Sequence, residues 1–214
     1  MNAKMDEKMN VLILLGGEEA SDELLRGQLA WADRVIAADS GVESILALGC
    51  EPDILTGDFD SLETDISSLN CRVEKKPHQD ATDFEKALVY ADTAAAVHIL
   101  GGLGGRHDHL ITNLLIAASI ETDIPVVFFS DIEVLHRVTP QFSLTGCFPA
   151  GATLSLLPFS RCEDVSASGL QWCLDGIVMG VGEQLGQSNI VVAADVQIKI
   201  GSGVMYVAVQ NDTH

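Results

Sequence analysis

Two aspartates separated by one residue, Asp58 and Asp60, form the feature with the clearest chemical potential. They stand in the run Gly57-Asp58-Phe59-Asp60-Ser61, directly after a short apolar segment. Carboxylates at positions i and i+2 of a turn can reach one hard cation, and Mg²⁺ takes oxygen ligands while it binds substrate phosphates. The same side chains could instead cap backbone amides within a turn. DxD pairs also occur in nucleotide-sugar transferases, so the pair alone does not define the reaction.

A second polar group surrounds the expected start of a helix at Thr82. It contains Gln79, Asp80, Asp83 and Lys86. Thr82 as N-cap would hold Asp83 in the first turn, where the helix dipole favours a carboxylate, and Lys86 could pair with it across three residues. A well-capped surface helix running to about residue 93 accounts for one acid. It accounts less well for two acids beside a glutamine.

A glycine-rich segment precedes another expected helix. Four glycines lie within residues 101–105 and are followed by Arg106, His107, Asp108 and His109. Backbone amides of such a segment can approach an anion closely, and a neighbouring arginine suits phosphate. The spacing is neither that of a P-loop nor GxGxxG. We expect the histidines to be loop and cap residues, because no cysteine or third histidine lies at zinc-ligand spacing.

A tryptophan in the C-terminal part is the fourth feature. Trp172 follows Ser168-Gly169, and Ser188-Asn189 comes sixteen residues later in the chain. An indole on a glycine-flanked strand could stack on a flat cationic ring, although a buried core position is the commoner role for tryptophan.

The elements that must position these residues change character along the chain. Up to about residue 130, apolar strand-like segments alternate with helix-like ones; the expected strands are residues 11–15, 34–38, 54–56, 72–75, 97–100 and 126–129. This alternation predicts a parallel sheet covered by helices on both faces. Ligands bind beyond the carboxyl ends of such strands, which is where Asp39, Asp58 and Gly101–Gly105 fall.

After about residue 135 the helical spacing disappears. Short strand-like runs are punctuated by glycine and proline, and Gly201-Ser202-Gly203 is predicted to close a hairpin between strands 196–200 and 204–209. We therefore predict an α/β nucleotide-binding domain at residues 9–135 and an all-β sandwich domain at residues 136–214.

The composition excludes some partners. The 214 residues include 12 Lys plus Arg and 31 Asp plus Glu, which gives a net charge of −19. So few cations cannot form the basic face that nucleic acid or an anionic membrane requires. The five cysteines form no CxxC pair, and no signal peptide or membrane-spanning run is evident. A cytoplasmic protein is expected.

Together these segments resemble the thiamine pyrophosphokinase family. The resembling pieces are ADSG (38–41), PDILTGDFDS (52–61), QDATDFEKAL (79–88), GGLGGRHDH with Asn113, and SGLQWCL with a later SN. They follow the family's order and span residues 38–189. Ser40 is a departure, because the family usually has glycine there.

The resemblance implies a magnesium-dependent homodimer that converts ATP and thiamine to AMP and thiamine diphosphate, with the active site shared between subunits. It also implies residue roles. Catalytic acids are Asp39, Asp58, Asp60, Asp83 and Asp108, of which Asp58, Asp60 and Asp83 bind Mg²⁺; ATP contacts are Gln79, Asp80, Thr82, Lys86, Gly102, Gly104, Gly105, Arg106 and His109; thiamine contacts are Trp172, Ser188 and Asn189.

Other functions remain open at this stage. A pyrophosphokinase for a pterin-like alcohol or a DxD-dependent nucleotide transferase would use similar acids and glycines. A nucleotide-sensing protein without turnover, or a regulatory α/β protein with an acidic loop, would also fit the composition.

Overall fold

The computed structural model describes residues 8–60, 62, 65–77, 80–120 and 124–211. The chain forms two compact units, Met1–Asn113 and Leu114–His214, whose boundary falls within helix α4 (His107–Ser119). The predicted domain boundary at residues 135 and 136 stays a prediction.

The first unit is built on parallel strands. They are β1 (Asn10–Leu14), β2 (Arg34–Ala38), β3 (Ile54–Gly57), β4 (Arg72–Lys75) and β5 (Ala96–Leu100). Their order in the sheet is β5-β1-β2-β3-β4, and each described neighbouring pair is parallel. The predicted α/β class is therefore confirmed.

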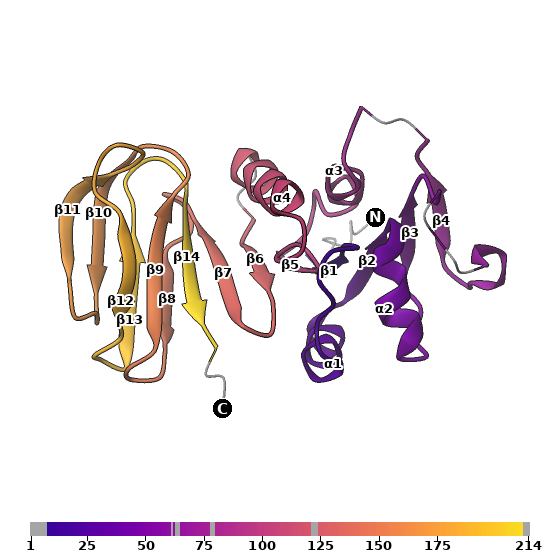
Figure 1. The fold of residues 1–214 in the computed structure, drawn as a ribbon, viewed down its shortest axis with the longest axis horizontal. Coiled ribbons are helices and arrows are strands. Elements are labelled where there is room, and N and C mark those ends of the chain that lie inside the picture. The colour runs from indigo at the N-terminus through magenta and orange to yellow at the C-terminus, as the bar shows by residue number, and fades with distance from the viewer. Residues whose placement is uncertain (1–7, 61, 63–64, 78–79, 121–123, 212–214) are drawn as a thin grey trace, which may run out of the picture. The chain divides into compact units, whose positions relative to one another are not determined.

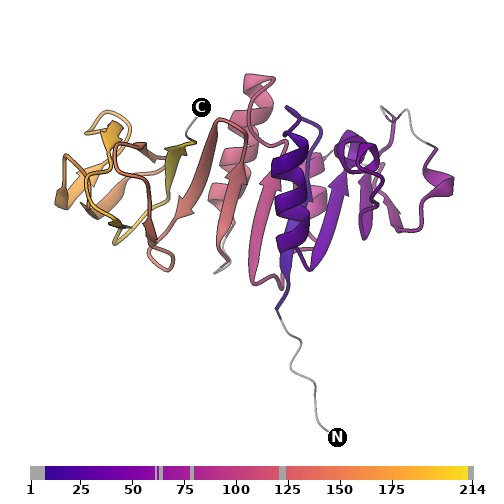
Figure 2. The same cartoon turned by 90° about the horizontal axis from the view of Figure 1, so that it is seen from below.

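Helices cover both faces of this sheet. They are α1 (Asp22–Trp31), α2 (Val42–Ala47) and α3 (Asp83–Leu88), with short 3₁₀ turns η1 (Asp39–Gly41) and η2 (Ile66–Ser68). Figures 1 and 2 show α1 and α3 on opposite faces. This follows from right-handed crossovers, because the chain moves outward from β1 to β4 and then returns through α3 to β5.

Side-chain caps begin two of these helices, and the cap at Thr82 confirms a prediction from the sequence. The Ser21 hydroxyl accepts a hydrogen bond from Leu24 N, and Thr82 forms a capping box with Glu85. The prediction that the helix capped by Thr82 reaches about residue 93 is wrong, because α3 ends at Leu88. Bonds from Tyr90 N to Ala87 O and from Ala91 N to Leu88 O tighten the chain into turns after Leu88.

The second unit contains two antiparallel groups of strands. One has the order β12-β9-β14-β7-β6, and the other has the order β11-β10-β13-β8. Their bounds are β6 (Val126–Phe129), β7 (Glu133–Val138), β8 (Leu144–Cys147), β9 (Thr153–Pro158), β10 (Cys162–Ser168), β11 (Leu174–Met179), β12 (Gly186–Ile190), β13 (Asp195–Lys199) and β14 (Met205–Gln210). The part of this unit that follows helix α4 is built of strands, which agrees with the all-β prediction for residues 136–214.

One predicted pairing in this unit is wrong. The turn at residues 201–203 does not join a hairpin, because β14 pairs with β7 and β9 while β13 pairs with β8 and β10. The glycines instead carry the chain from one sheet to the other. Gly203 has φ +91°, and a Cβ there would lie 2.5 Å from the Arg161 carbonyl oxygen.

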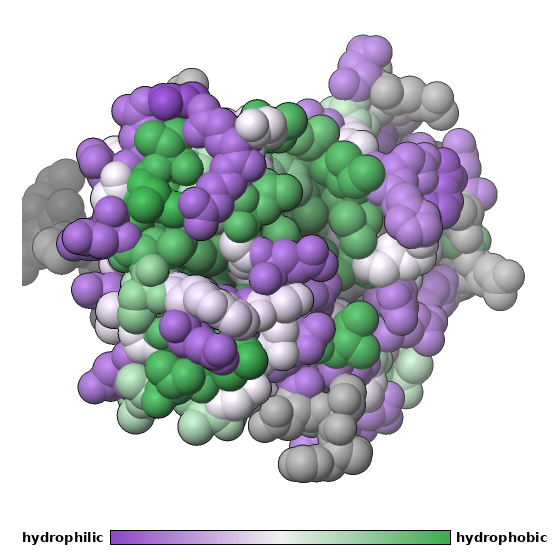
Figure 3. All heavy atoms as spheres, turned by 60° about the vertical axis from the view of Figure 1, so that its left-hand side comes forward, coloured by the Kyte–Doolittle hydropathy of each residue, from purple (hydrophilic) through white to green (hydrophobic). Residues whose placement is uncertain are grey.

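Apolar side chains also reach the surface. Figure 3 shows one face, on which apolar residues gather in patches bordered by polar ones. In the second unit the exposed large apolar side chains include Ile132, Trp172, Val181, Leu185 and Val192. Among the described residues, no helix combines the length and apolar character needed to cross a membrane.

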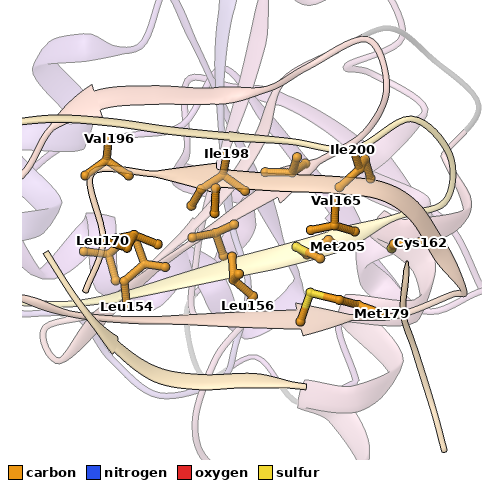
Figure 4. Packing of buried hydrophobic residues seen from close by; sticks show 14 of the residues in the cluster. Leu154, Leu156, Cys162, Val165, Leu170, Met179, Val196, Ile198, Ile200 and Met205 are labelled. Carbon is orange, nitrogen blue, oxygen red and sulfur yellow. The ribbon is translucent and has the colours of Figure 1, made fainter. Parts of the chain in front are cut away.

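The core of the second unit lies between its two sheets. Leu154 and Leu156 of β9 and Met205 of β14 contribute from one sheet, and Val165 and Ile198 contribute from the other. Figure 4 shows these side chains packed against one another, and all five are fully buried. Strand alternation explains the pattern, because every second residue of β9 and β13 points inward.

The stability of this unit should depend on the protonation of His136. Burial on β7 lowers the pKa of His136 to about 4. The unfolded chain, with an ordinary histidine pKa near 6.5, then binds more protons than the folded chain as the pH falls from 6.5 towards 4. Between pH 7.5 and 5.5 this group should remove about 1.3 kcal/mol from the free energy of unfolding.

Urea unfolding at the two pH values tests this expectation against His136→Phe, which cannot titrate. The variant should lose about 1.3 kcal/mol less than the wild type over the same interval. Equal losses in both proteins would show that another group carries the pH dependence.

Candidate active site

A cavity of about 850 Å³ lies beyond the carboxyl ends of β1, β2 and β5 in the first unit. Its described lining residues are Leu15, Gly16, Gly17, Glu18, Ala38, Asp39, Ser40, Thr82, Asp83, Phe84, Gly101, Gly102, Gly104, Gly105, Arg106, Asp108, His109, Leu110, Thr112 and Asn113. Nine of the sequence-predicted site residues occur in this lining.

The strand order explains the position of the cavity. Strands β1 and β5 are neighbours, but the chain leaves them in opposite directions across the sheet. The loops that follow them must therefore separate, and a crevice opens between them. The convergence of residues from sequence-distant loops is a consequence of this topology.

Glycines allow the two loops to approach each other closely at the base of the crevice. A Cβ on Gly17 would lie 2.1 Å from the Gly101 carbonyl oxygen, and one on Gly101 would lie 2.0 Å from the Leu15 carbonyl oxygen. Gly101 also has φ +69°, which other residues rarely adopt. Backbone contact between the loops after β1 and β5 therefore requires glycine on both sides.

A methyl group at position 17 should disturb this contact. We expect Gly17→Ala to lower the free energy of unfolding, measured in urea, by about 1–2 kcal/mol, because the Gly101 loop must shift. Gly27→Ala is the matched control: Gly27 lies within α1, and a Cβ there meets no atom within 4 Å. The control should stabilise the protein slightly; unchanged stability in Gly17→Ala would contradict the packing argument.

The end of β2 brings Asp39 to the cavity in a strained conformation. Asp39 has φ +48°, a region that aspartate tolerates better than most residues but that still costs energy. Gly57, at the end of the neighbouring β3, packs against it: a Cβ on Gly57 would lie 3.2 Å from the Asp39 backbone. This contact brings the DxD segment next to Asp39.

Within that segment, the structure shows a turn stabilised by an aspartate. Asp58 Oδ1 accepts a hydrogen bond of 3.2 Å from Asp60 N, while Phe59 between them has φ +65°. Neither aspartate is among the described residues of the cavity lining. In the described part of the chain, no three His, Cys, Asp or Glu residues form a group that could hold a metal ion. The metal role of Asp58 and Asp60 stays a prediction.

Helix α3 contributes an aspartate that is held by a buried lysine. Thr82 and Asp83 line the cavity, and the Lys86 ammonium lies 2.9 Å from Asp83 Oδ1. The Lys86 side chain is only 7% exposed and is not among the described lining residues. Lys86 therefore holds the Asp83 carboxylate by this ion pair without being part of the described cavity lining.

Two other predicted site residues in this region, Gln79 and Asp80, are not among the described residues of the cavity lining. Asp80 is exposed and does not occur in the described lining. Gln79 lies outside the described residues, as does Ser61 of the DxD segment.

The glycine-rich loop ends in an exposed ion pair. Arg106 donates from Nε and Nη2 to Asp108 Oδ1 and Oδ2, at 3.1 and 2.6 Å. These bonds lower the pKa of Asp108 to about 2, so its carboxylate is charged at neutral pH. Because the side chains are 71% and 63% exposed, the pair is weak, and Arg106 can exchange Asp108 for an incoming anion at little cost.

Helix α4 fixes the other side of this loop. His109 and Asn113 lie in the cavity lining, and the Asn113 amide donates to the Gly102 carbonyl oxygen at 3.2 Å. His107 is the first residue of the helix and His109 lies in its first turn, so the prediction that they are loop and cap residues is wrong: the helix begins earlier than expected.

The predicted thiamine residues all lie in the second unit. Trp172 is 55% exposed, so the common role of tryptophan in a core is excluded. Ser188 is exposed, whereas Asn189 is buried. Their roles in binding stay predictions.

Sequence reasoning missed one part of the cavity, the loop Leu15–Glu18 with the facing Ser40 and Thr112. The expected strand at residues 11–15 ends directly before Gly16-Gly17, which are not among the predicted site residues. The same argument that selected Asp39 and Asp58, position just beyond a parallel strand, applies equally to this loop.

Two family models match the chain in succession. Residues 25–128 match the model described as "Thiamin pyrophosphokinase, catalytic domain", and residues 136–205 match "Thiamin pyrophosphokinase, vitamin B1 binding domain". The chain belongs to the thiamin pyrophosphokinase family. The predicted family is thereby confirmed, and the loop Leu15–Glu18 precedes the part that the catalytic-domain model covers.

Individual relatives agree with this assignment. The chain is 27% identical over 218 residues to "Thiamin pyrophosphokinase 1" of Caenorhabditis elegans, which covers 94% of this chain and 89% of that protein. It is 29% identical over 178 residues to "Thiamine pyrophosphokinase 1" of Arabidopsis thaliana, covering 73% of this chain and 64% of the relative. A crystal structure of thiamin pyrophosphokinase from Geobacillus thermodenitrificans superposes with a TM-score of 0.79 at 26% identity, over 96% of this chain and 99% of that one.

Proposed function

We propose that this protein is a thiamine diphosphokinase that transfers the pyrophosphoryl group of ATP to the hydroxyl of thiamine and releases AMP. The observation that carries the proposal is the ordered match of its two parts to a catalytic and a vitamin B1 binding domain of one family. No observation favours a pterin-like alcohol or a protein without turnover.

The cavity of the first unit suits the triphosphate. Its glycine loops leave backbone amides accessible, and Arg106 lies beside them with a partner that it can release. The attack requires the thiamine hydroxyl oxygen to bond to the β-phosphorus of ATP while the bond from that phosphorus to the α–β bridging oxygen breaks. Positioning and charge neutralisation supply most of the catalysis in such transfers.

The acids of the site fit a divalent cation by donor type. Asp58, Asp60 and Asp83 offer carboxylate oxygens, which Mg²⁺ prefers, and Asp83 keeps one oxygen that the Lys86 pair does not use. When bound, Mg²⁺ supplies positive charge to the phosphate oxygens. Lys86 supports Asp83, and one of Asp39, Asp83 or Asp108 accepts the proton that the thiamine hydroxyl loses.

The second unit is proposed to receive thiamine. The exposed Trp172 offers an indole face to the cationic thiazolium or to the pyrimidine of thiamine. Ser188 and Asn189, the other two predicted thiamine residues, are neighbours on β12. The negative charge of the chain, −19, also favours a cationic substrate.

A homodimer in the cytoplasm completes the proposal. Exposed apolar side chains such as Val181, at 94% exposure, and Leu185, at 62%, are the kind of surface that a second subunit covers. Sedimentation at micromolar concentration tests the oligomeric state, and a monomer would contradict this part.

The test of the activity is AMP release from ATP and Mg²⁺ in the presence of thiamine. We expect release that depends on thiamine, and a pterin alcohol should not replace it.

A further inference from the structure

The side chain of Asn189 is buried and hydrogen-bonded to the backbone of Trp172. It is 4% exposed. Asn189 Oδ1 accepts hydrogen bonds from Trp172 N at 3.1 Å and from Ile190 N at 2.9 Å, and Asn189 Nδ2 donates to the Trp172 carbonyl oxygen at 2.8 Å. Both lone pairs of the amide oxygen are therefore in use. The side chain joins both polar backbone groups of a residue seventeen positions away.

A bulge in β12 turns Asn189 towards Trp172. The pairing of β12 with β9 shifts in register between Gly186 and Asn189, and Ser188 has φ +57°. The hydroxyl of Ser155, on β9, accepts a 3.0 Å hydrogen bond from Ser188 N. Bulges redirect side chains beside functional sites, and a non-glycine residue with positive φ needs such support.

Trp172 itself has little packing to fix its direction, because it is 55% exposed. Its neighbour Gln171 donates to Ile190 O at 2.8 Å, so the segment before the indole is also tied to β12. The direction in which the indole is presented therefore depends on backbone hydrogen bonds, and those to Trp172 come from Asn189.

From this geometry we infer that Asn189 is a positioning residue, which orients the Trp172 platform instead of contacting thiamine, and that Ser155 maintains the bulge that makes this possible. The inference rests on the proposed function, in which Trp172 stacks on thiamine.

A double-mutant cycle tests the inference. Asn189→Leu keeps the number and branching of the side-chain heavy atoms but forms no hydrogen bonds, and it should raise the KM for thiamine about 10-fold while the KM for ATP changes less than about twofold. If Asn189 acts through Trp172, Trp172→Ala/Asn189→Leu should match Trp172→Ala alone. Effects of the two substitutions that multiply would mean a direct contact with thiamine and would overturn the inference.

Two further variants separate positioning from general loss of structure. Gln187→Leu, at an exposed position on the same strand, should leave both KM values unchanged. Ser155→Ala should raise the KM for thiamine several-fold in a protein that still unfolds cooperatively, even if Asn189→Leu does not fold. An unchanged KM in Ser155→Ala would also count against the inference.

Failure of the proposed function gives a different result. In that case the wild-type protein would show no AMP release that depends on thiamine, whereas failure of the inference leaves wild-type turnover intact and changes only the coupling between positions 172 and 189.

Discussion

Asp58→Asn should lower the turnover of ATP and thiamine at least about 1000-fold, equivalent to roughly 4 kcal/mol of transition-state stabilisation. The neutral amide of asparagine lacks the negative charge of the carboxylate and is therefore a weaker ligand for Mg²⁺ beside a triphosphate. The fold should change little, because the Asn oxygen can still accept the hydrogen bond from Asp60 N that stabilises the turn. Loss of turnover with retained stability separates the chemical role of this residue from its structural role.

The measurement combines steady-state AMP release with urea unfolding for Asp58→Asn and Asp60→Asn. Asp65→Asn is a matched control, because Asp65 Oδ1 also accepts hydrogen bonds from a residue two positions later, Ser67, in an exposed turn. The control should have wild-type turnover. Near-normal rates in both Asp58→Asn and Asp60→Asn would remove the metal assignment.

Trp172→Ala should reduce kcat/KM for thiamine about 10- to 100-fold, since stacking of a ring on an aromatic side chain contributes about 1–3 kcal/mol. The KM for ATP should change less than about twofold. Stability should be nearly unchanged, because the indole is 55% exposed and the bonds from Asn189 involve only the Trp172 backbone.

Initial rates at varied thiamine and ATP give both constants. Trp172→Phe keeps an aromatic face and should recover most of the lost kcat/KM. Gln197→Ala, at an exposed polar position on β13 of the same unit, is the control and should behave as the wild type. Equal increases in the KM for thiamine and for ATP in Trp172→Ala would count against a stacking role.

The positions of the parallel strands could be predicted because their signal is local. Buried runs such as Val11–Leu14 and Val35–Ala38 are apolar throughout, and helix-spaced segments separate them. Once the sheet is parallel, residues that follow its strands must converge, which explains why Asp39 and Arg106 were found in one cavity.

The strand pairing of the second unit could not be predicted in the same way. A Gly-Ser-Gly turn favours a hairpin locally, yet Val196 and Val207 belong to different sheets that face each other across the core. The choice is made by packing between residues distant in sequence, and a turn signal contains no information about it.

The internal partners of polar side chains could be predicted only where they are close in the chain. The pairing of Lys86 with Asp83, three residues apart, is confirmed, whereas the bonds of Asn189 to the Trp172 backbone, seventeen residues away, had no signal in the sequence; the predicted substrate contacts of both residues stay predictions. Residue type reports which hydrogen bonds a side chain can form. Burial, which decides whether those bonds go to the protein, depends on the assembled fold.

Thiamine is proposed to be the acceptor of the pyrophosphoryl group. The most direct test is the identity of the products formed from ATP, Mg²⁺ and thiamine, resolved by chromatography. We expect AMP and thiamine diphosphate in equal amounts, with no ADP and no product from a pterin alcohol. Formation of ADP with thiamine monophosphate, or AMP release that a pterin alcohol but not thiamine supports, would contradict the proposal.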